Sequence, residues 1–139
     1  MDRQELEDRS ARFARQIFTL CGLVRSRPGG YEPANQLQNA ASSAAANYRA
    51  AARARSPKEF VAKLGVVNEE SDEAVYWLEF IETTALATGV EIARLQRESR
   101  ELRAIFAASY GTARRRQEER EKRREAKLKR SPDHKITRS

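Results

Sequence analysis

The fold is decided by residues 56–88, which read SPKEFVAKLGVVNEESDEAVYWLEFIETTALAT. Ser56 can cap a helix, Pro57 suits the first helical position, and Glu59 completes a capping box. Positions of one face then recur at alternating steps of four and three, and all but one are apolar: Phe60, Leu64, Val67, Ser71, Ala74, Leu78, Ile81 and Ala85. Gly89 can take the left-handed conformation after the last turn. At about 1.5 Å per residue the predicted helix is about 50 Å long, so it needs partner helices to bury its apolar face.

Three further segments have the same periodicity and are the predicted partner helices. They are residues 3–24, residues 34–54 and a segment that begins near Val90. Apolar residues and a few serines recur at three- and four-residue spacing: Leu6, Ser10, Phe13, Ile17, Leu20 and Val24; Leu37, Ala41, Ala44, Tyr48 and Ala51; Ile92, Leu95, Ser99, Leu102, Phe106 and Ser109. The connections are short, and no alternating runs typical of strands occur. The sequence therefore predicts an all-α, antiparallel up-down-up-down four-helix bundle with a charged C-terminal extension.

Positive charge is concentrated at the C-terminal end. The chain has 27 Lys and Arg against 20 Asp and Glu, a formal net charge of +7. Residues 1–111 contain 15 of each sign, so the whole excess lies in residues 112–139. This predicts a neutral bundle over residues 1–111 and a basic tail over residues 112–139 that is either helical or disordered. Ser131 and Pro132 should stop any helix, and the residues after them should be disordered.

The tail has two interpretations. Lys and Arg neutralise phosphates without reading sequence, which predicts contact with RNA or DNA. Against this, five acidic residues interrupt the run and no aromatic residue is available to stack on bases. The alternative is a tail that solubilises the bundle or binds a protein. The candidate nucleic-acid residues are Arg114, Arg115, Arg116, Arg120, Lys122, Arg123, Arg124, Lys127, Lys129 and Arg130.

The sequence offers no catalytic constellation. Cys21 and His134 each occur singly, which excludes an intramolecular disulfide and a histidine-based metal cluster. The acidic residues between positions 69 and 73 lack a Glu-x-x-His partner, and we expect them to be solvated or paired across subunits. The sequence thus predicts a non-enzyme without metal, cofactor or small-molecule substrate. No apolar run approaches the roughly 20 residues of a membrane span, and the amino terminus is charged, so we expect a cytoplasmic protein without membrane contact.

Two of the predicted helices have a second side that other subunits can contact. The alanine-dense helix at 34–54 can be approached closely from two sides. Trp77 and Phe80 lie outside the main seam of the third helix, so they are either core edge or subunit contact. Asn39 and Asn47 are either hydrogen-bonding groups of an interface or plain polar surface. These four residues are the candidates for the interface of a homo-oligomer.

Two segments also resemble a known family. Residues 36–47 (QLQNAASSAAAN) and 56–61 (SPKEFV), followed by Leu64 and Glu73, resemble the bacterial four-helix-bundle proteins encoded in intervening sequences of large-subunit ribosomal RNA genes. A related family is the accessory variability protein of diversity-generating retroelements. The resemblance covers about residues 6–110 and implies a ring-like homo-oligomer, a pentamer, without catalytic residues. For the retroelement relatives it implies binding to RNA and to a reverse transcriptase through basic surfaces. The chain departs from the family pattern at Ala44-Ala45, at Arg49-Ala50-Ala51 and at Glu69-Glu70.

These observations predict a non-enzymatic, oligomeric helical scaffold that contacts nucleic acid or a nucleic-acid enzyme such as a reverse transcriptase. The alternative is a purely structural protein–protein interaction module in which the tail only keeps the chain in solution.

Overall fold

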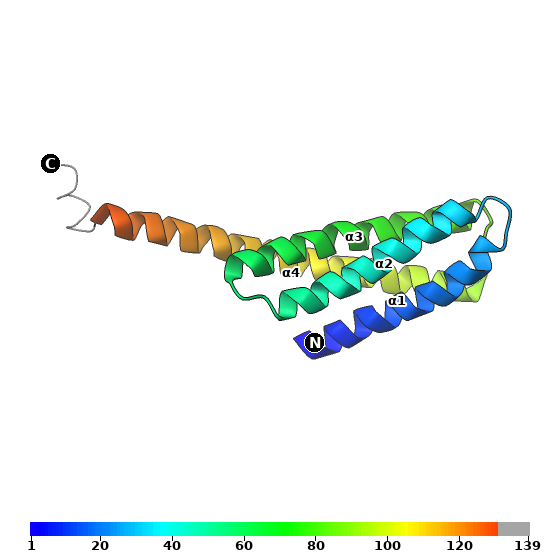
Figure 1. Ribbon diagram of the computed structural model, residues 1–139, viewed down its shortest axis with the longest axis horizontal. Coiled ribbons are helices and arrows are strands. Elements are labelled where there is room, and N and C mark those ends of the chain that lie inside the picture. The colour runs from blue at the N-terminus through cyan, green and yellow to red at the C-terminus, as the bar shows by residue number, and fades with distance from the viewer. Residues whose placement is uncertain (131–139) are drawn as a thin grey trace.

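The computed structural model describes residues 1–130 of the chain, and it arranges them as a bundle of four antiparallel helices (Figure 1). The helices are α1 (Arg3–Arg25), α2 (Tyr31–Ala52), α3 (Pro57–Thr83) and α4 (Val90–Arg130). No strand occurs within residues 1–130. The predicted all-α up-down-up-down bundle is confirmed. None of these helices combines the length and the apolar character needed to cross a membrane.

The predicted seams meet in the core. Leu37 of α2, Leu64 and Leu78 of α3 and Leu95 and Phe106 of α4 are almost completely buried. Burying a side chain of this size contributes roughly 1.5–3 kcal/mol, so the four seams together hold the helices side by side.

One layer of the core is made of small residues. Ser10, Ser71 and Ser99 come from three helices and meet Ala41 and Ala44 of α2 around a void of about 10 Å³. Ser10 and Ser71 donate their hydroxyls to carbonyl oxygens one turn earlier in their own helices. The Oγ of Ser99 has no hydrogen-bond partner among residues 1–130. A buried hydroxyl without a partner lowers stability, because its interaction with water is lost and not replaced.

The end of α3 differs from the prediction. The helix ends before Thr84, and the seam position Ala85 is an exposed residue in the left-handed conformation, with φ of 59°. The Ala85 N–H donates to Glu82 O at 2.9 Å and the Leu86 N–H donates to Ile81 O at 3.0 Å, which is a Schellman motif. The two preceding threonines, residues 83–84, donate their hydroxyls to carbonyl oxygens of the last turn and so favour its termination.

Helix α4 continues past the other three helices (Figure 1). It runs without a break across residue 111 to Arg130, so of the two states predicted for the tail, residues 112–130 take the helical one. Ala113 is the last buried residue, and residues 118–130 are all exposed. The predicted stop at Ser131 and the predicted disorder beyond it lie outside the described residues. The division of the chain at residue 111 stays a prediction.

Helix α1 packs closely on α2 and much less on α4. A group of ion pairs spans this weak side of the bundle. Arg9 donates through Nε and Nη2 to the two carboxylate oxygens of Glu98, at 2.9 and 2.6 Å, and its Nη2 lies 2.9 Å from Glu101. The paired carboxylates raise the pKa of Arg9 further above its ordinary value, so the guanidinium remains charged. We call these three residues the α1–α4 clamp.

Candidate nucleic-acid interface

The core-facing positions of α4 continue in one register beyond the bundle. Inside the bundle they are apolar or small and recur at alternating steps of three and four: Ile92, Leu95, Ser99, Leu102, Phe106, Ser109 and Ala113. The next positions of the same series are all basic: Arg116, Arg120, Arg123, Lys127 and Arg130. We call these five residues the basic stripe. Because positions at this spacing share one side of a helix, the seam changes from apolar to positively charged where the bundle ends.

Three of the four acidic residues within residues 112–130 lie away from the basic stripe. Glu118, Glu121 and Glu125 are themselves spaced by three and four residues. At 3.6 residues per turn they lie on roughly the opposite side of α4 from the stripe. The other five basic residues of this segment lie outside the stripe: Arg114, Arg115, Lys122, Arg124 and Lys129. The side of α4 opposite the stripe therefore carries both signs of charge, and of the four acids only Glu119 lies beside the stripe.

Several arginines of the bundle pair with nearby carboxylates, whereas within residues 1–130 those of the stripe do not. Arg9, Arg53, Arg94, Arg100 and Arg103 each have a carboxylate oxygen within 3.4 Å. Among residues 112–130 the one ion pair joins Arg114 to Glu118 at 4.0 Å, and no stripe residue has a carboxylate within that distance among residues 1–130. The stripe is thus an uncompensated positive surface.

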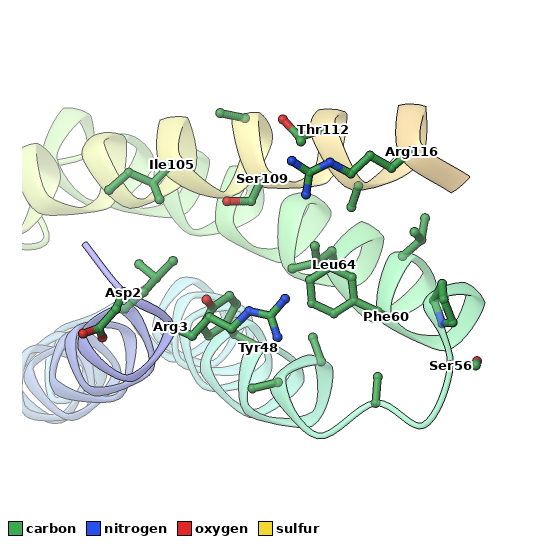
Figure 2. Close-up of a pocket in the computed structure, with 18 of the residues that line it drawn as sticks. Asp2, Arg3, Tyr48, Ser56, Phe60, Leu64, Ile105, Ser109, Thr112 and Arg116 are labelled. Carbon is green, nitrogen blue, oxygen red and sulfur yellow. The ribbon is translucent and has the colours of Figure 1, made fainter. Parts of the chain in front are cut away.

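A cleft of about 740 Å³ lies at the end of the bundle from which α4 emerges (Figure 2). Its apolar lining includes Leu6 of α1, Phe60 and Leu64 of α3, and Ile105 of α4. Tyr48 of α2 also lines the cleft, and burial raises the pKa of its hydroxyl. We call this space the end cleft.

The rim of the end cleft is basic. Its four arginines are Arg3, Arg55, Arg116 and Arg120. Figure 2 shows Arg3 of α1 and Arg116 of α4 reaching into the space from different sides. The Arg3 guanidinium lies over the Phe60 ring at 4.9 Å from its centroid. Among residues 1–130 the single acidic lining residue is Asp2, which accepts the Glu5 N–H at 2.8 Å as the cap of α1.

Local sequence signals explain how Phe60 reaches the cleft. The Ser56 Oγ accepts the Glu59 N–H at 3.1 Å, which confirms the predicted cap, and Pro57 occupies the first turn. This start fixes the register of α3, so the first seam residue, Phe60, lies one turn inside the helix. The end cleft is bounded by the start of α1, the end of α2 and the start of α3, and α4 passes along its side.

The predicted interface residues of α3 lie together. Trp77 and Phe80 pack with ring centroids 5.3 Å apart, and Tyr76, which sequence reasoning missed, lies 4.9 Å from Trp77. Tyr76 is 55% exposed, whereas Trp77 is partly buried against the core. The single chain therefore places Trp77 at the core edge, and its role as a subunit contact stays a prediction.

The predicted interface residues of α2 share no hydrogen bond with each other among the described residues. Asn39 is exposed. Asn47 donates through Nδ2 to Ser43 O at 2.9 Å within its own helix. Their role across an interface also stays a prediction.

The acidic residues of α3 are partly used inside the chain. Asp72 Oδ1 lies 3.4 Å from Arg103 of α4, so this carboxylate pairs within the bundle. Burial, with the neighbouring charges of Glu73 and Glu69, raises the pKa of Glu70. Within residues 1–130, no group of three or more His, Cys, Asp or Glu is placed to hold a metal ion.

The sequence model of the 23S rRNA-intervening sequence protein family matches residues 3–108. Among solved structures, the chain is similar to a protein of unknown function from the S23 ribosomal protein family from Bacteroides thetaiotaomicron, with a TM-score of 0.73 and 25% identity. That similarity covers 80% of this chain and 99% of the other. No curated protein sequence matches this chain. The basic stripe begins after the residues that the family model matches.

Proposed function

The chain belongs to the 23S rRNA-intervening sequence protein family, and on that premise we propose that it is a non-enzymatic helical scaffold that contacts nucleic acid through α4. The observation that supports this proposal is the change of the α4 seam from apolar residues to the basic stripe. A seam position normally packs against another helix, and five positive charges there oppose packing against a second copy of the same stripe. A polyanion can neutralise these five positive charges, whereas a second copy of the stripe cannot.

The dimensions of the stripe suit a phosphodiester chain. From Arg116 to Arg130 the helix rises about 21 Å, at about 1.5 Å per residue. Phosphates of one strand follow one another at about 3.4 Å along a duplex, so the stripe spans several of them. Lys and Arg that neutralise phosphates release condensed counterions, which makes such binding strongly dependent on salt.

The test is the affinity of the full chain for labelled RNA and DNA oligonucleotides, measured by fluorescence anisotropy at several salt concentrations. Five phosphate contacts predict a slope of log K against log salt of about −3.5 to −4.5. A chain that ends at Gly111 should lose nearly all of this affinity. Equally weak binding by both chains would overturn the proposal and favour the protein–protein interaction module.

We also propose that the scaffold is a homo-oligomer, a pentamer by resemblance. Tyr76 supports this part, because its ring is 55% exposed on α3 beside the partly buried Trp77 and Phe80. Light scattering should give about five times the chain mass of 15.8 kDa, and Tyr76→Lys should dissociate the oligomer without unfolding the bundle. A wild-type mass of one chain would contradict this part alone.

The resemblance to retroelement accessory proteins adds a reverse transcriptase as a proposed protein partner. Binding of the full chain to a purified reverse transcriptase of such an element, measured with nuclease present, tests this part. Binding that disappears with nuclease would show that the enzyme and the scaffold share only the nucleic acid.

A further inference from the structure

We propose that the end cleft holds an unpaired base of a single-stranded nucleic acid whose phosphates follow the basic stripe. This inference rests on the proposed nucleic-acid contact and specifies the form of nucleic acid that the site prefers.

The end cleft and the basic stripe are continuous. Arg116 and Arg120 are the first two residues of the stripe, and both also line the cleft. They lie one turn apart on the side of α4 that faces the cleft. Phosphates neutralised along the free part of α4 therefore lead to the opening of the cleft.

The lining of the cleft suits a base. The Phe60 ring is half-buried beside the apolar side chains of Leu6 and Leu64 in the lining, and the Arg3 guanidinium lies 4.9 Å from the centroid of the Phe60 ring. Aromatic rings and guanidinium planes are the groups on which proteins stack unpaired bases. The volume of about 740 Å³ falls within the range of about 300–1,000 Å³ typical of small-ligand sites.

The charges around the cleft favour an anion over other occupants. Asp2, the single acidic side chain that the described part of the chain contributes to the lining, is already engaged as the cap of α1. An acidic amphipathic peptide would also meet basic and apolar groups at the cleft. Beyond the cleft, however, the one large apolar side chain of residues 116–130 is Leu128, which lies outside the stripe, so an amphipathic helix finds no apolar face there. A phosphodiester chain uses both the stripe and the cleft.

A duplex can use only the stripe. Its bases are paired and stacked inside, and moving one of them out costs a few kcal/mol of pairing and stacking. A single strand presents its bases without this cost. The site should therefore prefer a single strand to a duplex of the same sequence.

The experiment compares a labelled 20-nucleotide RNA with the same RNA annealed to its complement, using the full chain and fluorescence anisotropy. Phe60→Leu keeps an apolar side chain in the cleft but removes the ring. Phe18→Leu is the matched control, since Phe18 is an exposed ring on α1 that does not line the cleft. Stacking on aromatic side chains is strong enough that Phe60→Leu should weaken single-strand binding at least about fivefold. Duplex affinity should stay within about twofold, and Phe18→Leu should change neither.

A second readout uses a single strand with 2-aminopurine, whose fluorescence falls when the base stacks. Addition of the wild-type chain should quench it, and Phe60→Leu should remove most of the quenching. Equal affinity of the wild type for single strand and duplex would overturn the inference. The inference would also be overturned if Phe60→Leu, shown by circular dichroism to be folded, bound RNA and quenched 2-aminopurine like the wild type. The stripe would then bind the nucleic acid alone, and the cleft would suit another class of ligand such as an acidic peptide. If the wild type binds no nucleic acid at all, the proposed function itself fails.

Discussion

Replacing Arg9 by Met should open the weak side of the bundle. The substitution keeps an aliphatic stem but removes the guanidinium that joins α1 to Glu98 and Glu101 at 2.6–2.9 Å. The Arg9 side chain is 16% exposed and that of Glu98 is 24% exposed, so water replaces the lost contacts only in part. Hydrogen bonds to charged groups contribute about 1.5–3 kcal/mol each when shielded, and exposed ion pairs contribute 0.2–1 kcal/mol. We expect a loss of about 2 kcal/mol in the free energy of unfolding.

Urea denaturation followed by far-UV circular dichroism measures this loss. Arg100→Met is the matched control, because Arg100 pairs with Glu79 at 3.3 Å with both side chains about half exposed. The control should lose less than about 1 kcal/mol. A loss for Arg9→Met no larger than that of the control would refute the role of the clamp.

The dependence on pH gives an independent check of the same clamp. The hydrogen bonds from Arg9 lower the pKa of Glu98 below its ordinary value of 4.5. A lowered pKa in the folded state stabilises the protein fully above the ordinary value, and this stabilisation is lost as pH falls through the folded-state pKa. The difference between wild type and Arg9→Met should therefore be constant from pH 6 to 8 and shrink below about pH 4. A difference that stays unchanged at pH 3 would contradict the assignment to this ion pair.

Three further substitutions or reactions test the bundle. Ser99→Ala should raise the free energy of unfolding by about 1 kcal/mol, since it removes a buried hydroxyl that has no hydrogen-bond partner among residues 1–130. The control is Ser42→Ala at an exposed position. A Ser99→Ala chain less stable than the wild type would contradict the prediction. Ala85→Gly should stabilise the chain by about 1 kcal/mol, because glycine takes the left-handed conformation without strain. Ala87→Gly, at a buried position, should destabilise the chain. Urea denaturation measures both changes. Cys21 is fully buried, and burial raises the pKa of its thiol to about 11. Iodoacetamide at pH 8 should therefore label this thiol only in denaturant. Rapid labelling of the native chain would contradict the burial of this face of α1.

The bundle was predictable because the spacing of apolar residues in each helix shows which of its faces is buried. The seam of residues 56–88 and the cap at Ser56 identified α3 without knowledge of its partners. The end of α3 was not predictable in the same way. Ala85 takes the left-handed conformation, which glycine usually occupies at the end of a helix. This conformation allows the hydrogen bonds that close the last turn of α3, and the sequence of this segment does not show them.

The candidate site was only partly predictable. The basic residues of the tail were recognised from composition, and the acids among them counted against nucleic-acid contact. The spacing of Arg116, Arg120, Arg123, Lys127 and Arg130 already separates them from most of those acids, but this signal requires the register of α4 to extend beyond the bundle. The end cleft left no trace in the sequence. It depends on where the other three helices stop relative to α4, which is set by packing between distant segments.

The central claim is that one side of α4 binds nucleic acid, and two variants of equal charge test it most directly. The first replaces Arg116, Arg120, Arg123 and Lys127 by Gln, and the second replaces Arg114, Arg115, Lys122 and Lys129 by Gln. Both full-length chains lose four positive charges, so a difference in their RNA affinity reports position and not net charge. At 0.1 M salt the first variant should bind RNA on the order of 100-fold more weakly than the wild type, and the second only a few-fold more weakly. Equal losses in the two variants would contradict the claim.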